Sequence, residues 1–336
     1  MKICVVGAGS IGGLVGAKLA LAGEEVTLVD VGAHLEAIRK NGLKLIGPDG
    51  AESVVRPAKA TASMQEAGAQ DVVILALKTN VIASVAQGMR ALFGPRTVIV
   101  PVQNGLPWWY FHKHGGEFEG RRMESCDPTG EIGQHIDSNS VIGCVVYPAG
   151  EVTAPGVVHH VEGDRFPVGE LDGKETERVK RVSELFVKAG FKSPVLDNIR
   201  SEIWLKLWGN MSFNPISALT HATLVDLCQF TPTRDLAADM MREAQAIANK
   251  LGIEFRVPLE KRIAGAEKVG KHKTSTLQDV EQGRALELDA LIGAVIELGR
   301  LTQTPTPHID SVYALVKLLD KTVQEQHGYL RVQARA

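Results

Sequence analysis

The chain has 336 residues, of which 44% are hydrophobic and 23% charged, with a formal net charge of −2 at pH 7. This length suggests about two domains, each large enough for its own core, and the composition is that of an ordinary globular protein. There is no basic footprint for nucleic acid or an anionic membrane, and no apolar run approaches the roughly 18 residues of a membrane span. We therefore expect neither partner.

The four cysteines are far apart in the sequence and form no C-x-x-C pair; they are Cys4, Cys126, Cys144 and Cys228. This usage suits a reducing compartment and excludes a cysteine zinc site. Because the first predicted strand starts at residue 2, we expect no leader peptide and a cytoplasmic location. No other metal-ligand spacing is visible, so no metal is predicted.

A dinucleotide-binding pattern occupies the start of the chain. Residues 2–6 are apolar and β-branched, which predicts a buried strand, and they lead into Gly7-x-Gly9-x-x-Gly12. Gly7 permits a tight turn, Gly9 lets the backbone approach a pyrophosphate, and Gly12 lets the next helix pack closely. That helix, predicted over 13–22, directs free N–H groups and its positive dipole end at the phosphate.

A second predicted strand, over 25–29, ends at Asp30. The acid follows the first glycine by roughly the 20 residues at which a carboxylate meets a ribose hydroxyl. A glycine turn that binds nothing is the alternative, but strand, glycines, helix, second strand and acid all occur in order. We predict that the cofactor contacts are Gly7, Gly9, Ser10, Ile11, Gly12 and Asp30.

Strands and helices then alternate along the chain. The predicted strands are 71–77, 97–102, 141–146, 156–160, 165–169 and 194–196, and the predicted helices are 33–40, 61–67, 83–92 and 175–188. Such alternation is typical of a doubly wound sheet, which binds ligands outside the carboxyl ends of its strands. Lys78 and Asn104 each follow a predicted strand, so both are expected beside the cofactor.

The segment 106–140 is less regular and includes the aromatic run 108–112; a loop this long is usually functional or mobile. From about Ile199 the sequence becomes nearly continuous helix. We therefore place an NAD(P)-binding Rossmann domain at 1–198 and a helical substrate and catalytic domain at 199–336.

A helix predicted over 202–213 carries Lys206, Asn210 and Asn214 at spacings of four, and these form one stripe because each step drifts by about 40°. The simplest interpretation of this stripe is a solvent-exposed helix face. The rest of the helix is apolar, however, with Ile203, Trp204, Leu207, Trp208, Met211 and Phe213. A helix apolar nearly all round is buried, so the stripe should line a wet cavity or meet polar partners. Pro215 should bend or end the helix.

A second helix of interest is predicted from about 276 to 301, with a core-facing apolar pattern at 288, 291, 292, 295 and 296. Glu287 lies at the edge of that face, where it could reach a cleft or be solvated. Ser275-x-x-Gln278 fits a capping box, which explains Ser275 without a ligand. Asp279 and Arg284 are most simply surface or ion-pair residues.

These motifs together resemble the ketopantoate reductase (2-dehydropantoate 2-reductase) family over nearly the whole chain. The features that carry the resemblance are Gly7-x-Gly9-x-x-Gly12, Leu77-Lys78, Asn104-Gly105, Trp204-x-Lys206-Leu207-x-x-Asn210-x-x-x-Asn214-Pro215, and Ser275-x-x-Gln278-Asp279 with Glu287 downstream. The resemblance implies an α/β protein in which a Rossmann-type doubly wound sheet precedes an all-α domain like the C-terminal domain of 6-phosphogluconate dehydrogenase.

The resemblance also implies a reaction and residue roles. Hydride would pass from NAD(P)H to C2 of a 2-oxo acid, converting 2-dehydropantoate to pantoate in pantothenate and coenzyme A biosynthesis. Lys206 would be the general acid that protonates the carbonyl oxygen. Asn210 and Asn214 would bind the hydroxyl and carboxylate end of the substrate, Ser275 would bind its carboxylate, and Glu287 would orient the substrate or the lysine. Lys78 and Asn104 would lie where cofactor and substrate meet.

The coenzyme and the substrate leave alternatives. The family usually favours NADPH, often with an arginine just past the second strand, whereas here Asp30 is followed by Val31-Gly32 and the first arginine is Arg39. A carboxylate repels a 2′-phosphate, so Asp30 favours NADH. The aromatic segment 106–140 could remodel the pocket for a bulkier 2-oxo or β-hydroxy acid. A non-catalytic dinucleotide sensor is the remaining alternative, and a homodimer is expected by analogy only.

Overall fold

Five parallel strands form the central sheet of the N-terminal part of the chain, in the order β5-β2-β1-β6-β7. They are β1 (Lys2–Val6), β2 (Glu25–Val29), β5 (Lys59–Thr61), β6 (Gln70–Leu75) and β7 (Phe93–Pro101). The order reverses between β1 and β6, and the central strands are buried because helices cover both faces. The predicted doubly wound sheet is confirmed.

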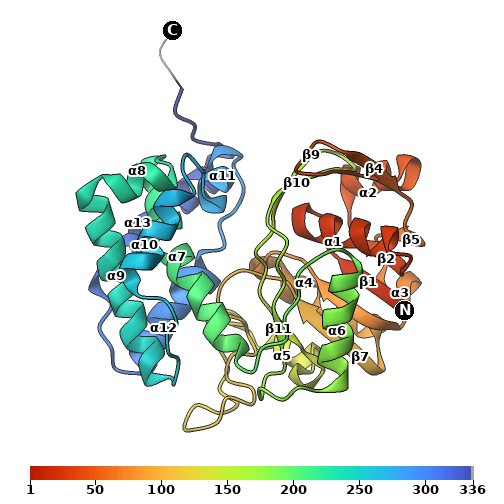
Figure 1. The fold of residues 1–336 in the computed structure, drawn as a ribbon, viewed down its shortest axis with the longest axis horizontal. Helices are drawn as coiled ribbons and strands as arrows, with labels where there is room; N and C mark the ends of the chain where they lie inside the picture. The colour runs from red at the N-terminus through yellow and green to blue at the C-terminus, as the bar shows by residue number, and fades with distance from the viewer. Residues whose placement is uncertain (334–336) are drawn as a thin grey trace. The chain divides into compact units, whose positions relative to one another are not determined.

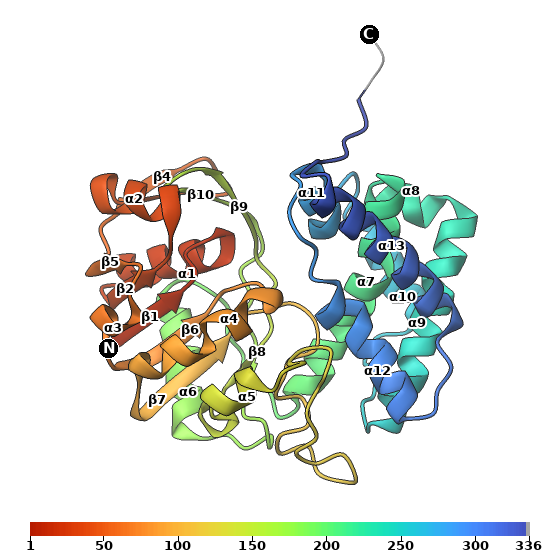
Figure 2. The same cartoon turned by 180° about the vertical axis from the view of Figure 1, so that it is seen from behind.

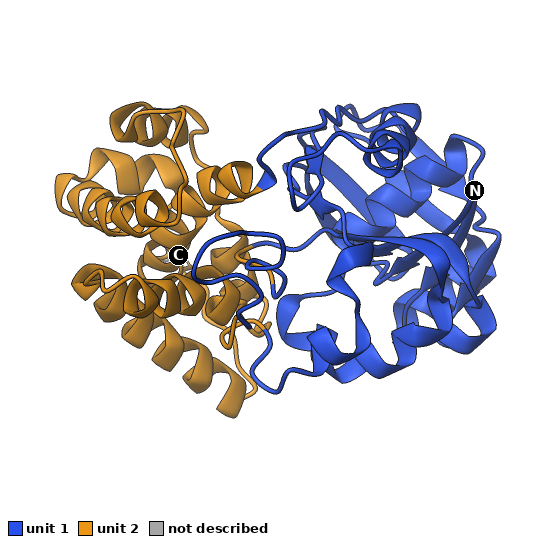
Figure 3. Cartoon of the chain, turned by 90° about the horizontal axis from the view of Figure 1, so that it is seen from below, with its two compact units in different colours: residues 1–104, 108–122, 127–199 blue, residues 105–107, 123–126, 200–336 orange. Residues whose placement is uncertain are grey.

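The chain folds as two units in this computed structural model, which describes residues 1–333 (Figure 3). Unit 1 comprises residues 1–104, 108–122 and 127–199, and unit 2 comprises 105–107, 123–126 and the chain from 200 onward. Two short stretches of the irregular segment therefore pack with the helical unit, while the rest of that segment packs with the sheet.

The helices of unit 1 lie on the two faces of its sheet. They are α1 (Ser10–Leu21), α2 (Gly32–Asn41), α3 (Met64–Ala67), α4 (Thr79–Met89), α5 (Glu131–His135) and α6 (Glu177–Lys188), with short 3₁₀ turns η1 (Arg90–Leu92) and η2 (Ser138–Ser140). Helices α1 and α6 cover one face and α4 and α5 the other (Figures 1 and 2). The amphipathic α6 buries Val179, Val182, Leu185 and Phe186.

A second sheet of unit 1 has the order β4-β3-β10-β9, from β3 (Leu43–Ile46), β4 (Glu52–Val55), β9 (Ala149–Ala154) and β10 (Val157–Glu162). Its hairpin β9–β10 packs on α1: a Cβ placed on Gly13 would lie 2.8 Å from Val158 Cγ2. A third, two-stranded sheet pairs β8 (Gly143–Cys144) with β11 (Val168–Gly169). Sequence analysis missed β4 and β9, which are edge strands with at most one buried residue each.

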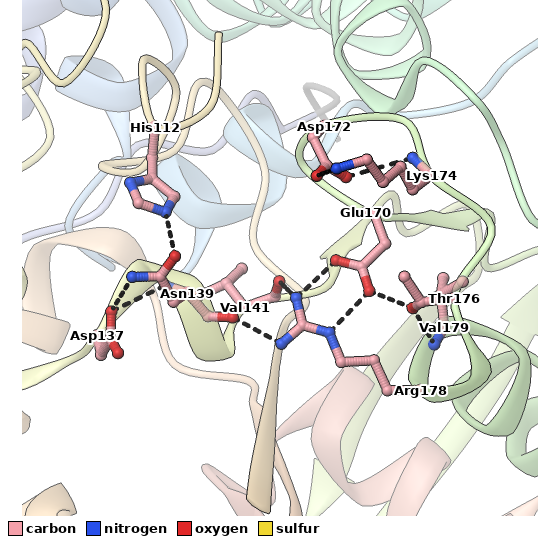
Figure 4. A network of polar contacts seen from close by, with 10 residues as sticks. All are labelled: His112, Asp137, Asn139, Val141, Glu170, Asp172, Lys174, Thr176, Arg178 and Val179. Carbon is pink, nitrogen blue, oxygen red and sulfur yellow. Dashed lines mark hydrogen bonds and ion pairs between the residues drawn. The ribbon is translucent and has the colours of Figure 1, made fainter.

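The aromatic run of the irregular segment belongs to the core of unit 1. Trp108, Trp109, Tyr110 and Phe111 are all at most 7% exposed. The end of the segment is attached to α6 by Arg178, whose Nη1 donates to the Asn139 carbonyl at 2.6 Å (Figure 4). These aromatic residues are therefore packed within the protein as part of unit 1, and their role in shaping a substrate pocket stays a prediction.

Unit 2 is helical, as the sequence predicted. Its elements are α7 (Ile199–Thr220), α8 (Leu224–Gln229), α9 (Thr231–Lys250), α10 (Leu259–Lys268), α11 (Ser275–Glu281), the π-helical turn η3 (Asp289–Gly293), α12 (Ala294–Leu301) and α13 (Pro307–Glu325). Helix α7 does not end at Pro215 but continues to Thr220, since the residues that follow the proline, Ile216 and Ala218, are buried and keep the last turns packed. None of the helices in residues 1–333 is both long and apolar enough to cross a membrane.

The prediction of one helix over 276–301 is wrong. The chain turns at Gly283, which has φ +66° and lies against the Gly328 carbonyl, so that a Cβ there would be 2.5 Å from that oxygen. The capping interpretation of Ser275 is also wrong, because Thr274 is the N-cap and its hydroxyl accepts from the Leu277 N–H at 3.3 Å. Of the two alternatives for Asp279 and Arg284, surface residues or ion-pair residues, the structure shows an ion pair: Arg284 Nε donates to Asp279 Oδ1 at 2.6 Å.

Candidate active site

The glycine turn joins β1 to α1 beside the end of β6. Gly7 has φ +92°, and a Cβ on it would lie 2.9 Å from the Ala76 carbonyl oxygen. A Cβ on Gly12 would lie 1.8 Å from the Gly7 carbonyl oxygen, so helix and turn touch there. Gly9 is different, because the position of its missing Cβ has no atom within 4 Å. Two glycines thus serve close packing, and Gly9 faces open space.

The backbone N–H groups at the start of α1 are available to a ligand. The first bond of the helix runs from the Gly13 N–H to the Gly9 carbonyl at 2.7 Å. Within residues 1–333, the N–H groups of Gly9, Ser10 and Ile11 have no acceptor. Such a helix start, with its dipole, suits a phosphate group.

Asp30 follows β2 and lies beside the same turn. Its Oδ2 accepts from the Ala8 N–H at 2.6 Å, and its Oδ1 accepts from the Val31 N–H at 2.6 Å. The nearest following arginine is engaged elsewhere, since Arg39 donates to Glu36 at 2.7 Å and to the Ala60 carbonyl at 3.0 Å. A carboxylate, not a guanidinium, is therefore fixed at the end of β2.

Lys78 and Asn104 lie at the same edge of the parallel sheet. Lys78 is the N-cap residue of α4, three residues past β6. The neighbouring β7 is in register with β6, and beyond it the Val102 N–H and the Gln103 side chain both donate to the Leu75 carbonyl, at 2.9 and 2.6 Å. Asn104 comes next, so the two predicted residues follow adjacent strands, each half-buried.

The polar stripe of α7 is surrounded by buried apolar side chains. Trp204 and Trp208 are fully buried, and Trp208 Nε1 donates to the Met241 carbonyl at 2.6 Å. Within the stripe, Asn214 is only 7% exposed, while Lys206 and Asn210 are half-buried. Asn214 is therefore not on an ordinary solvated face, while the role of the stripe as a whole stays a prediction.

Sequence analysis missed Glu202, which is fully buried one turn before Lys206 and accepts a hydrogen bond from Arg256. The signal was present, since the four-residue spacing of the stripe continues back to Glu202. It also missed Arg262, whose guanidinium lies so close to Gly209 of α7 that a Cβ there would be 2.0 Å from Nη2. Two charged groups thus adjoin the stripe.

Ser275 and Glu287 lie outside α7. Ser275 is the exposed first residue of α11, and Glu287 is half-buried just before the π-helical turn η3. The Ala290 carbonyl in that turn accepts from the Leu106 N–H at 2.9 Å. Gly105 is tightly packed there, with φ +89° and a Cβ position 2.5 Å from the same oxygen. The residue after Asn104 is therefore anchored next to the Glu287 segment.

A doubly wound sheet with an open glycine turn, followed by a helical unit with a partly buried lysine–asparagine stripe, is typical of a class of dinucleotide-binding oxidoreductases. Residues 3–114 match the family described as ketopantoate reductase PanE/ApbA, and residues 198–320 match its C-terminal domain. A 2-dehydropantoate 2-reductase of Mesorhizobium japonicum is 55% identical over 95% of this chain and 98% of that protein. The chain belongs to the ketopantoate reductase family.

Solved structures agree with this assignment. A candidate ketopantoate reductase from Ralstonia solanacearum has a TM-score of 0.91 and 39% identity over 96% of this chain and 98% of that one. The 2-dehydropantoate 2-reductase of Methylococcus capsulatus has a TM-score of 0.78 and 28% identity over 96% of this chain and 98% of that one. The similarity thus spans both units, as the sequence motifs predicted.

Proposed function

We propose that this protein reduces 2-dehydropantoate to pantoate with a reduced nicotinamide dinucleotide. The observation that carries the proposal is the α7 stripe, in which Lys206, Asn210 and Asn214 project from a helix otherwise packed into the core. An ammonium and two amides on one helix face can together hydrogen-bond a small polar substrate such as a 2-oxo acid. The identity to a named reductase across nearly the full chain supports the same activity.

The residues of unit 2 supply acid catalysis and orientation in this proposal. As the carbonyl at C2 is reduced, negative charge grows on its oxygen, and the Lys206 ammonium stabilises that charge and donates the proton. A positioned acid of this kind typically contributes 10²- to 10⁴-fold. Asn210 and Asn214 bind the hydroxyl and carboxylate end of the substrate, Ser275 binds the carboxylate, and Glu287 orients the substrate or the lysine.

Unit 1 holds the cofactor, which supplies the hydride when bound. The N–H groups of Gly9, Ser10 and Ile11 suit its pyrophosphate, and the close packing at Gly7 and Gly12 shapes the turn that presents them. Lys78 and Asn104 stand at the strand ends where a ligand of such a sheet binds. We assign cofactor binding to residues 1–198 and substrate binding and catalysis to residues 199–336.

NADH is the proposed coenzyme. The Asp30 carboxylate is fixed by two backbone N–H groups at the end of β2, where it can accept from a free 2′-hydroxyl and repel a 2′-phosphate. Arg39 is held by Glu36 and the Ala60 carbonyl. A kcat/KM at least tenfold higher with NADPH than with NADH would refute this preference.

A panel of 2-oxo acids, followed by nicotinamide absorbance with both coenzymes, tests the activity. The proposal predicts the highest kcat/KM for 2-dehydropantoate. Preference for a bulkier acid such as phenylglyoxylate would favour the related-dehydrogenase alternative. Coenzyme binding without reduction of any of these acids would favour the alternative of a non-catalytic dinucleotide sensor. A homodimer and a cytoplasmic location stay predictions, which sedimentation equilibrium and cell fractionation can test.

A further inference from the structure

His34, in the first turn of α2, is hydrogen-bonded to the glycine turn. Its Nε2 lies 3.0 Å from the Ala8 carbonyl oxygen, and its Nδ1 lies 3.0 Å from the Gly156 backbone nitrogen. The Gly156 N–H can only donate, so Nδ1 is the unprotonated nitrogen. The ring proton therefore resides on Nε2 and is donated to Ala8, and one tautomer serves both bonds.

Both polar backbone groups of Ala8 are thereby fixed by residues that follow β2. Its N–H donates to Asp30 Oδ2 at 2.6 Å and its carbonyl accepts from His34, while the residue itself is fully buried. The Ala8–Gly9 peptide is trans, so its carbonyl and the Gly9 N–H point in opposite directions. Fixing the carbonyl toward His34 therefore directs the Gly9 N–H away from His34.

The second bond of His34 ties this arrangement to the β9–β10 hairpin. Gly156 is in the hairpin turn with φ +77°, and a Cβ there would lie 2.9 Å from Ala37 Cβ of α2. The same hairpin packs on the start of α1 through Val158, against Gly13. The imidazole thus joins three segments of unit 1: the glycine turn, α2 and the hairpin.

We propose that His34 is a positioning residue for cofactor binding, which orients the Gly9 N–H toward the pyrophosphate through its hydrogen bond to the Ala8 carbonyl. The inference rests on the proposed function, because it requires a dinucleotide at the glycine turn. It assigns to His34 a role in coenzyme affinity and none in the chemical step. The competing explanation is that His34 only anchors the hairpin. In that case its loss would affect folding, but it would not weaken phosphate-containing ligands more than adenosine.

Three substitutions separate the two bonds of the imidazole. H34A removes both, H34N keeps an acceptor near Gly156 but no donor that reaches Ala8, and H34Q keeps a donor toward Ala8. His159, on β10 of the same hairpin and paired with Glu151 at 3.3 Å, provides the control H159N. The binding of NADH is measured by fluorescence, and the binding of ADP-ribose and adenosine by competition with NADH. For each variant the kcat, the KM of NADH, the KM of the 2-oxo acid and the melting temperature are also measured.

The proposal predicts that H34A and H34N raise the Kd of NADH and ADP-ribose about tenfold, as expected for one hydrogen bond. The kcat at saturating coenzyme, the KM of the 2-oxo acid and the affinity for adenosine, which has no phosphates, should not change. H34Q and H159N should stay within about threefold of the wild type. Equal Kd values for H34A and wild type, or a loss of adenosine affinity as large as that of NADH, would overturn the inference. Wild-type protein that binds neither coenzyme would instead refute the proposed function, and the inference with it.

Discussion

Arg178 and Glu170 form a two-pronged ion pair in unit 1, with Nε and Nη2 donating to Oε1 and Oε2 at 2.7 and 2.6 Å (Figure 4). Glu170 is 2% exposed and also accepts from the Thr176 hydroxyl. Burial by itself raises the pKa of this carboxyl, but the hydrogen bonds from Arg178 and Thr176 outweigh it and hold the pKa below its ordinary value of 4.5. The pair therefore depends on an ionised carboxylate.

Acid should weaken unit 1 through this pair. Because the pKa of Glu170 is lower in the folded state, its stabilising contribution is complete above about pH 5 and is lost as the pH falls below about 4.5. In E170Q, unfolding by urea should be easier at pH 7, by about 1–3 kcal/mol, and should depend less on pH between 5 and 3 than in the wild type. Parallel pH profiles for the two proteins would contradict this role.

Two glycine-to-alanine substitutions should separate packing from ligand binding. G9A adds a methyl group where no atom lies within 4 Å, so the melting temperature should stay within a degree or two while the Kd of NADH rises at least tenfold. G12A places a Cβ 1.8 Å from the Gly7 carbonyl oxygen, so it should lower the melting temperature by several degrees or prevent folding. If G9A binds NADH as tightly as the wild type, the pyrophosphate does not bind in the open space beside Gly9.

Removal of the Asp30 charge should change the coenzyme preference. D30N keeps a side-chain acceptor for a backbone N–H but no longer repels a 2′-phosphate, so the ratio of kcat/KM for NADH over NADPH should fall at least tenfold. Asp71 provides the matched control, since its Oδ2 accepts from the Lys2 N–H at 2.9 Å at the start of β1. An unchanged ratio in D30N, or the same change in D71N, would assign the preference to other residues.

Glycine at position 105 should be required for activity. It has φ +89° and lies against the Ala290 carbonyl. G105A would therefore strain the backbone next to Asn104 and push against the turn that follows Glu287. We expect kcat to fall at least tenfold. The Kd of NADH should change less than kcat, because the glycine turn is untouched and only Asn104, proposed to lie beside the cofactor, adjoins the strained residue. G23A is the control, since Gly23 also has positive φ, +84°, but no atom near its Cβ position. Equal loss in both variants would indicate backbone strain alone.

The start of the fold was predictable because its signals are local. The strand, the glycine turn, α1, β2 and Asp30 depend on residues near one another in sequence. They appear in the predicted order, and α1 begins at Ser10, three residues before its predicted start. The break at Gly283 was not predicted, although a glycine within a predicted helix can mark its end; a Cβ there would lie 2.5 Å from the Gly328 carbonyl oxygen. The edge strands β4 and β9 lack the apolar runs that reveal central strands.

The candidate site was predictable in part for the same reason. The four-residue spacing along α7 revealed the stripe of Lys206, Asn210 and Asn214, and the structure buries its last member, Asn214. Ser275 and Glu287 rested on the family resemblance, and their roles stay predictions. His34 had no sequence signal, because its function depends on contacts with Ala8 and Gly156, which are distant in the chain.

The most direct test of the account is the pre-steady-state and steady-state reduction of 2-dehydropantoate by K206A, with K321A as an exposed-lysine control from α13. The account predicts that K206A binds NADH with the wild-type Kd but loses at least about 10²-fold in kcat, while K321A retains full activity. A K206A protein that turns over at the wild-type rate would contradict the assignment of this ammonium as the proton donor.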